Sequence, residues 1–227
     1  TEEFNALHYL PQSDSLLKVF PTQSQIYNRS VFAAEPTITE EQARQEFNTS
    51  VKMVKRTIEY LKKDGKVVYV IGHSYGTTLL LEYLDRAGNR ADKLVLMGYN
   101  LDMDLKNIEA LRRGKIFVWK NGTDPVEQDP FPPFLKWTSM SEKFTNMSMM
   151  MLNGKKRYTQ ALAEDALDNV VYVYGKYDES VGRPKLHELD FLQSKGVNII
   201  ELEGGHMSMW SKEFMSTLNK IMIQNGT

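Results

Sequence analysis

A serine between two glycines, in the order Gly72-His73-Ser74-Tyr75-Gly76, constrains the fold of this chain more than any other feature. The apolar, β-branched run at residues 66–71 precedes it and predicts a strand that is buried on both faces. A short apolar helix is predicted directly afterwards, over residues 77–84. The chain must therefore turn sharply from strand to helix at Ser74, and glycines suit the flanking positions because side chains would clash there. Such a turn exposes the serine hydroxyl and points the positive end of the helix dipole at it.

Helix and strand patterns alternate from residue 37 onward. Two overlapping capping boxes, beginning at Thr37 and Thr39, predict a helix start, and apolar side chains then recur every three or four residues from Phe47 to Leu61, before Gly65. Further strands are predicted over 93–97, 170–174 and 197–202, with helices over 186–192 and 210–221. This alternation predicts parallel βαβ units and therefore an α/β fold, with a mostly parallel sheet covered by helices on both faces.

Residues 101–165 interrupt that alternation. They contain Asn121-Gly122, a proline and phenylalanine cluster over 129–134, and a methionine-rich run. We expect an inserted helical cap here, with helices near 104–112 and 139–151, while residues 1–100 and 166–227 form the core. The position of the insertion between strands would place it over Ser74. Its Phe134 and Trp137 would then line an apolar substrate pocket, unless they only pack the cap onto the core.

The composition narrows the chemistry. Lys and Arg number 28 against 29 Asp and Glu, so the net charge of −1 gives no excess for binding a nucleic-acid backbone. There is no cysteine, which excludes disulfides, thiolate metal sites and thiol catalysis. None of the four histidines is paired at a spacing of four residues, so we expect no metal ion and no cofactor. No apolar run approaches the roughly 20 residues of a membrane-spanning helix.

The compartment and the oligomeric state stay open. Asn-x-Ser/Thr triplets begin at Asn28, Asn48, Asn121, Asn146 and Asn225; these are either coincidental or glycan acceptors of an exported protein. The sequence begins at Thr1 without an apolar leader, which fits both a leader that has been removed and one that never existed.

Two residues can serve the serine in catalysis. A serine hydroxyl needs a base to become a nucleophile, and the base needs a carboxylate that fixes its tautomer. Asp178 and His206 each follow a predicted strand, and the carboxyl ends of parallel strands meet at one edge of the sheet. The pattern predicts a triad of Ser74, His206 and Asp178, with Asp102 or Asp104 as the alternative acid.

With nucleophile, acid and histidine in this order, the chain resembles the α/β-hydrolase superfamily over nearly its whole length. The resemblance implies a serine hydrolase with a helical cap that acts on a small or medium carboxylic ester, with a thioester or an amide as alternatives. It also implies two oxyanion donors, the N–H of Tyr75 and that of Leu10 or its neighbour Tyr9. Tyr9 is also expected to contact the substrate. The chain would begin at the third strand of the family's sheet, with the usual first hairpin missing or preceding the given sequence.

Two positions depart from the family pattern. Tyr9 stands where the oxyanion loop has a glycine, and Thr77 stands where a glycine frequently follows the elbow. Of the remaining histidines, we expect His73 to point away from Ser74 in a structural role and His8 to brace its loop, whereas His187 has no visible partner. A noncatalytic binding module remains an alternative, as do acyl transfer and cofactor-free haloperoxidase chemistry on the same triad.

Overall fold

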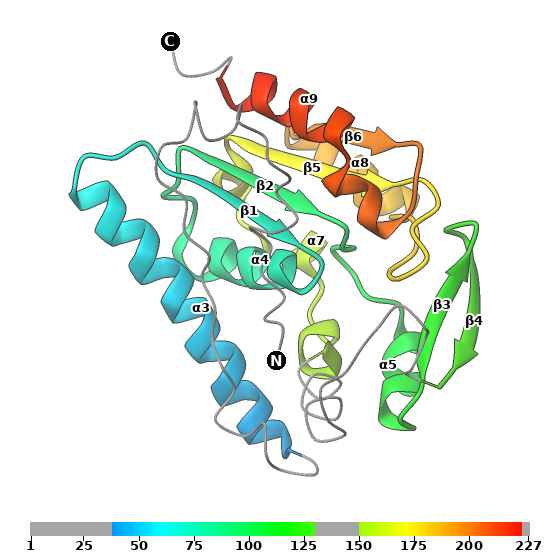
Figure 1. Ribbon diagram of the computed structural model, residues 1–227. Coiled ribbons are helices and arrows are strands. Elements are labelled where there is room, and N and C mark those ends of the chain that lie inside the picture. The colour runs from blue at the N-terminus through cyan, green and yellow to red at the C-terminus, as the bar shows by residue number, and fades with distance from the viewer. Residues whose placement is uncertain (1–37, 130–149, 224–227) are drawn as a thin grey trace, which may run out of the picture.

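A computed structural model describes residues 38–129 and 150–223, and its centre is a parallel sheet (Figure 1). The four strands are β1 (Tyr69–His73), β2 (Lys93–Met97), β5 (Val170–Gly175) and β6 (Asn198–Leu202), in the order β1-β2-β5-β6. Gly72 pairs with Leu96, and Met97 pairs with Val173. Because all these pairings are parallel, the strands end at one common edge, which confirms the predicted α/β sheet.

Helices cover both faces of the sheet. They are α3 (Glu40–Lys63), α4 (Tyr75–Ala87), α8 (Leu186–Ser194) and α9 (Lys212–Ile223). Leu94 and Leu96 of β2 pack in a large apolar cluster with α3, α4 and α8, whereas Val95 and Met97 pack against α9. Figure 1 shows α9 on the opposite side of the sheet from α3 and α4. Side chains of a strand alternate between faces, so the continuous apolar run of β2 supplies both layers.

Helix α3 begins and ends as its sequence predicts. Thr39 and Gln42 form a reciprocal capping box at its start, and Gly65 follows its last turn with φ 73°. Phe47, Val51, Val54 and Ile58 of its stripe are buried, and Leu61 at its end is half-buried. The alternative cap, Thr37, lies outside the described residues.

Three predicted boundaries or side chains differ in the structure. The first strand begins at Tyr69, and Val67, within the predicted strand, is 65% exposed because the chain has not yet entered the sheet. Leu186 is exposed because the first turn of α8 extends beyond the apolar cluster that Leu192 joins. Trp210 lies in a short 3₁₀ turn, His206–Trp210, ahead of α9.

The insertion contains a hairpin that the sequence analysis does not predict. Between β2 and β5 lie α5 (Leu105–Arg112), β3 (Ile116–Lys120), β4 (Asp124–Gln128), α7 (Tyr158–Ala161) and a 3₁₀ turn, Glu164–Leu167. The antiparallel β3 and β4 are joined through Asn121 and Gly122, both with positive φ. Helix α5 matches its prediction, while most of the helix expected over 139–151 lies outside the described residues.

Candidate active site

Ser74 sits in a strained turn between β1 and α4. Its φ of 54° and ψ of −121° are rare for a residue with a side chain, and its N–H donates to the Met97 carbonyl at 2.9 Å. A Cβ on Gly72 would lie 2.7 Å from Leu80 Cδ1 and 2.8 Å from the Gly76 carbonyl oxygen. The predicted clash is therefore present at Gly72. At Gly76, by contrast, no described atom comes within 4 Å of such a Cβ, apart from its chain neighbours and the nearby backbone of its own helix.

Thr77, the departure from the family's glycine, connects the turn to β2. Its fully buried hydroxyl accepts the Met97 N–H at 3.1 Å. The same hydroxyl lies 2.9 Å from the Gly72 carbonyl oxygen and 2.7 Å from that of Met97, and it can donate its single proton to either. The side chain therefore links the ends of both strands beside the nucleophile.

Asp178 and His206 form a buried pair at the carboxyl edge of the sheet. Oδ2 of Asp178 lies 2.8 Å from Nδ1 of His206, and the aspartate is fully buried. Its other oxygen accepts the N–H groups of Ser180 at 2.9 Å and Val181 at 3.0 Å. These bonds fix the carboxylate, which in turn orients the ring so that Nε2 faces away from Asp178, as a general base requires.

Ser74 lies at the same edge as this pair, with Gly98 between them in the packing. Gly98 follows Met97, whose carbonyl holds the Ser74 N–H, and has φ 60°. A Cβ on Gly98 would lie 3.2 Å from Cε1 of His206 and 3.1 Å from the Met209 sulfur. Between the described side chains of Ser74 and His206 there is no hydrogen bond. Such bonds are often long in an unliganded site and tighten with substrate.

His73 contacts the other side of His206. Its Nε2 donates to the His206 carbonyl oxygen at 3.1 Å, and the two ring centroids are 4.6 Å apart. Burial, and to a smaller extent the charge of His206, lowers the pKa of His73 to about 4. The ring is therefore neutral near pH 7 and can hold the proton on Nε2 that this hydrogen bond needs.

The alternative acids are engaged elsewhere. Asp102 is buried and lies 3.1 Å from Nε2 of His187, which therefore has a partner that the sequence analysis did not see. Asp104 caps helix α5 through the N–H of Lys106. Of the three candidate acids, only Asp178 contacts His206 in the described structure.

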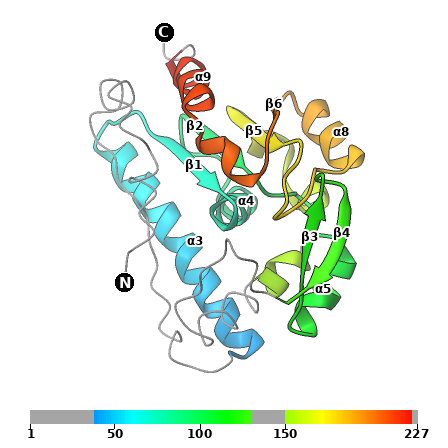
Figure 2. The same cartoon turned by 45° about the vertical axis from the view of Figure 1, so that its right-hand side comes forward.

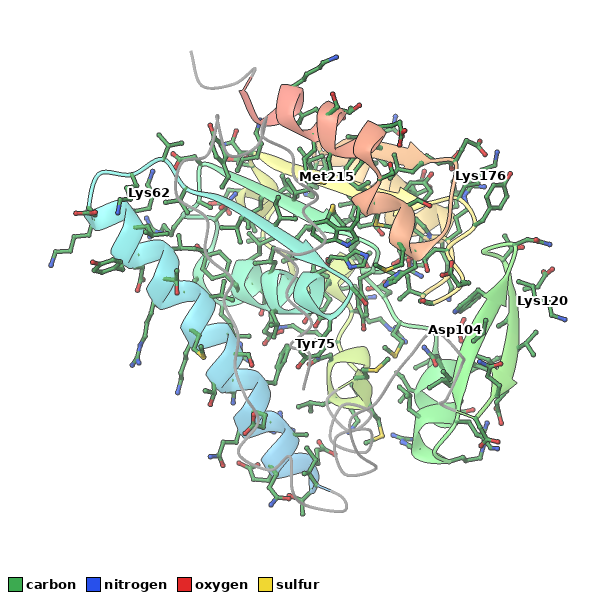
Figure 3. The ribbon with its side chains drawn as sticks, in the orientation of Figure 1. Lys62, Tyr75, Asp104, Lys120, Lys176 and Met215 are labelled. Atoms are coloured by element: carbon green, nitrogen blue, oxygen red, sulfur yellow. The ribbon has the colours of Figure 1, made fainter. Side chains whose placement is uncertain are left out.

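Of the predicted oxyanion and substrate residues, the structure describes only Tyr75. Tyr75, labelled in Figure 3, is the first residue of α4. Its side chain is half-buried and interacts with Asn153 of the insertion. Burial raises the pKa of its hydroxyl. The other predicted positions lie outside the described residues: His8, Tyr9, Leu10, Phe134 and Trp137.

Comparisons with known proteins agree with the fold described above. A family model described as the alpha/beta hydrolase fold matches residues 32–125. The solved structure of MGS-M2, an alpha/beta hydrolase enzyme from a Medee basin deep-sea metagenome library, is 13% identical and covers 93% of this chain and 82% of its own, with a TM-score of 0.50. The chain has the α/β-hydrolase fold.

A second solved structure, the monoacylglycerol lipase of Paleococcus ferrophilus, is 16% identical and covers 82% of this chain and 74% of its own, with a TM-score of 0.49. No curated protein sequence matches the chain.

In this α/β-hydrolase fold, the hairpin of the insertion packs against the loop that carries the acid (Figure 2). Trp119 N–H donates to the Glu179 carbonyl at 2.9 Å, and Arg183 N–H donates to the Gly122 carbonyl at 2.7 Å. The Trp119 ring lies so close to Gly182 that a Cβ there would come within 2.5 Å of it. The Asn121-Gly122 pair, flanked by an apolar β-branched run, was the sequence signal for this hairpin.

A cavity of about 290 Å³ opens between the acid loop, the hairpin and the residues after β2. Much of its wall is apolar, including Tyr99, Met103, Trp119, Met150 and Val181. Its cationic residues are paired, Arg183 with Glu201 at 2.5 Å and Lys185 with Asp104 at 2.8 Å. The mostly apolar wall and the paired cations suit an uncharged ligand. The described residues that line this cavity include Asp102 and none of Ser74, Asp178 and His206.

Residues 38–129 and 150–223 contain no group of three His, Asp or Glu side chains placed to hold a metal ion. Within the same ranges, no helix has both the length and the apolar character needed to cross a membrane.

Proposed function

We propose that this chain is a serine hydrolase that cleaves a small or medium uncharged carboxylic ester. The observation that carries the proposal is the buried Asp178–His206 pair, at 2.8 Å, on the sheet edge where the strained turn presents Ser74. The α/β-hydrolase fold, shared with a solved hydrolase enzyme, supports the same reaction class.

The reaction follows from the roles of the three side chains. Ser74 Oγ attacks the ester carbonyl carbon while His206 Nε2 takes the hydroxyl proton. The ring then gives that proton to the alcohol oxygen as the C–O bond breaks, which leaves an acyl group on Ser74. Water, deprotonated by His206, attacks the acyl carbon. The bond between that carbon and Ser74 Oγ then breaks, the ring returns its proton to Oγ, and the acid is released. Asp178 holds the ring in one orientation and stabilises its positive charge throughout.

The oxyanion of the tetrahedral intermediate requires N–H donors. We assign the first to Tyr75, which follows the nucleophile at the start of α4, and the second to Leu10. The uncharged ester is favoured because the cationic residues of the nearby cavity are already paired with acids. We further propose that residues 101–165 act as a cap, with Tyr9, Phe134 and Trp137 in contact with the substrate.

A fluorophosphonate probe tests the proposal directly, since it forms a covalent bond only with an activated serine. We expect peptide mapping by mass spectrometry to find the probe on Ser74, and the folded Ser74→Ala variant to remain unlabelled. A panel of aryl esters of increasing acyl length then defines the preferred substrate. A folded protein that the probe does not label at Ser74 would contradict the proposal.

A noncatalytic binding module is the second candidate. It is favoured by the missing hydrogen bond between Ser74 and His206 among the described residues. The same labelling experiment separates the two, because a module that only binds ligands has no activated serine.

A further inference from the structure

His206 is held at three separate atoms by three side chains. Asp178 binds ring Nδ1 at 2.8 Å, and His73 donates to the backbone carbonyl at 3.1 Å. Glu179 Oε2 accepts the backbone N–H of His206 at 3.0 Å. Two of these contacts therefore act on the main chain of His206, on opposite sides of its Cα, and the hydrogen bond with Asp178 acts on the ring.

We propose that Glu179 is a positioning residue, which fixes the main chain of His206 and so determines where its ring stands relative to Ser74. The proposal rests on the proposed function, in which His206 is the base. A hydrogen bond to a carboxylate is stronger than one between neutral groups, so this contact restrains the backbone more firmly than a neutral acceptor would. Glu179 acts through His206 and touches no reacting atom.

Gly205 supplies a second, independent observation. A Cβ on this residue would overlap Oε2 of Glu179, while the next neighbouring group, the Tyr177 carbonyl oxygen, lies 3.6 Å away. The backbone of Gly205 has φ −90° and ψ −167°, a conformation that any residue adopts. Glycine is therefore not needed here for its backbone freedom. It leaves the space that the Glu179 carboxylate occupies.

The other end of Glu179 is held by the insertion. Its carbonyl accepts the N–H of Trp119 in β3 at 2.9 Å, and its neighbour Asp178 is held by the amides of Ser180 and Val181. A continuous set of contacts therefore runs from the hairpin through Glu179 to His206. The hairpin supports the base as well as the acid.

The first test compares three variants by their kcat and KM on an aryl ester and by their rate of labelling with a fluorophosphonate. We expect Glu179→Ala to lower kcat and the labelling rate about tenfold with little change in KM, because a displaced base loses alignment rather than binding. Glu179→Gln keeps an acceptor oxygen and should recover most of that loss. Glu203→Ala is the matched control, since this carboxylate follows β6 on the loop of His206 but pairs with Lys176, at 2.6 Å.

A double-mutant cycle tests the mechanism. Gly205→Ala should push the Glu179 carboxylate away and reproduce the loss seen in Glu179→Ala. In the Glu179→Ala background, Gly205→Ala should then cost little more, because the group it displaces is already gone. Losses that simply multiply, or a Glu179→Ala variant with the wild-type kcat, would overturn the proposal.

An NMR readout separates this proposal from the proposed function. We expect the Nδ1–H proton of His206, bound to Asp178, to shift or broaden in Glu179→Ala and to stay unchanged in Glu203→Ala. If Ser74 resists labelling but this signal depends on Glu179, the hydrolase assignment fails and the positioning role stands. If Ser74 is labelled while neither the Nδ1–H signal of His206 nor the labelling rate changes in Glu179→Ala, the positioning role is refuted.

Discussion

Replacing Thr77 with valine exchanges one hydroxyl beside the nucleophile for a methyl group and leaves the shape of the side chain almost unchanged. The site is fully buried, so by hydrophobicity alone valine would be neutral or stabilising there. The hydrogen bonds predict the opposite. Without the hydroxyl, the Met97 N–H loses the acceptor that it has at 3.1 Å, and the carbonyl of Gly72 or Met97 that takes the hydroxyl proton loses that donor.

The magnitude follows from those two groups. A buried donor left without a partner costs about 1–3 kcal/mol. The Met97 carbonyl still accepts the Ser74 N–H, so it adds little to this cost. We therefore expect Thr77→Val to lower the free energy of unfolding by about 2 kcal/mol. Thr77→Ser keeps the hydroxyl and loses one buried methyl group, worth about 1 kcal/mol. Valine should therefore destabilise the protein more than serine does.

Urea unfolding at pH 7 measures this order, provided that the slope of the free energy against urea is the same in all variants. The labelling rate of Ser74 with a fluorophosphonate adds a local readout, because the hydroxyl holds the ends of β1 and β2 on either side of the turn. A Thr77→Val variant as stable as the wild type, or more stable than Thr77→Ser, would refute the reasoning.

Three further predictions concern the neighbouring residues. Asp178→Asn should lower kcat about 10⁴-fold in a folded protein, because an amide favours the wrong tautomer of His206, whereas Asp102→Asn should change kcat little; the reverse result would move the acid to Asp102. Because burial lowers the pKa of His73 to about 4, the unfolded state takes up its proton first as the pH falls. The free energy of unfolding should therefore drop between pH 6.5 and 4, by up to about 3 kcal/mol more than in His73→Gln. If urea unfolding gives the same dependence on pH for both proteins, this prediction is wrong. Gly98→Ala and Gly114→Ala both place a side chain at positive φ, which costs about 1–2 kcal/mol. Only Gly98 is crowded, by Met209 and His206, so only Gly98→Ala should also lower kcat, and equal activity of the two variants would exclude that contact.

Local patterns predicted the central elements of the fold. Strand β2 occupies the predicted residues 93–97, and the capping box at Thr39 begins α3. The hairpin at Asn121-Gly122 is not among the predicted elements although its turn signal is also local, because only helices, near 104–112 and 139–151, are predicted in the insertion. Errors at strand and helix ends, such as exposed Val67, arose because periodicity does not show where an element leaves the sheet.

The sequence by itself determined the strand order along the chain, the turn at Ser74 and a short set of acids and bases, because these depend on residues close together in the chain. The tertiary structure decided which of those groups meet. Asp102, Asp104 and Asp178 all follow strands of the same sheet, and only the packing of the acid loop brings one of them to His206. The role of Glu179 could not be predicted from the sequence for the same reason. His206, its partner, is 27 residues away, and their contact depends on how two loops pack.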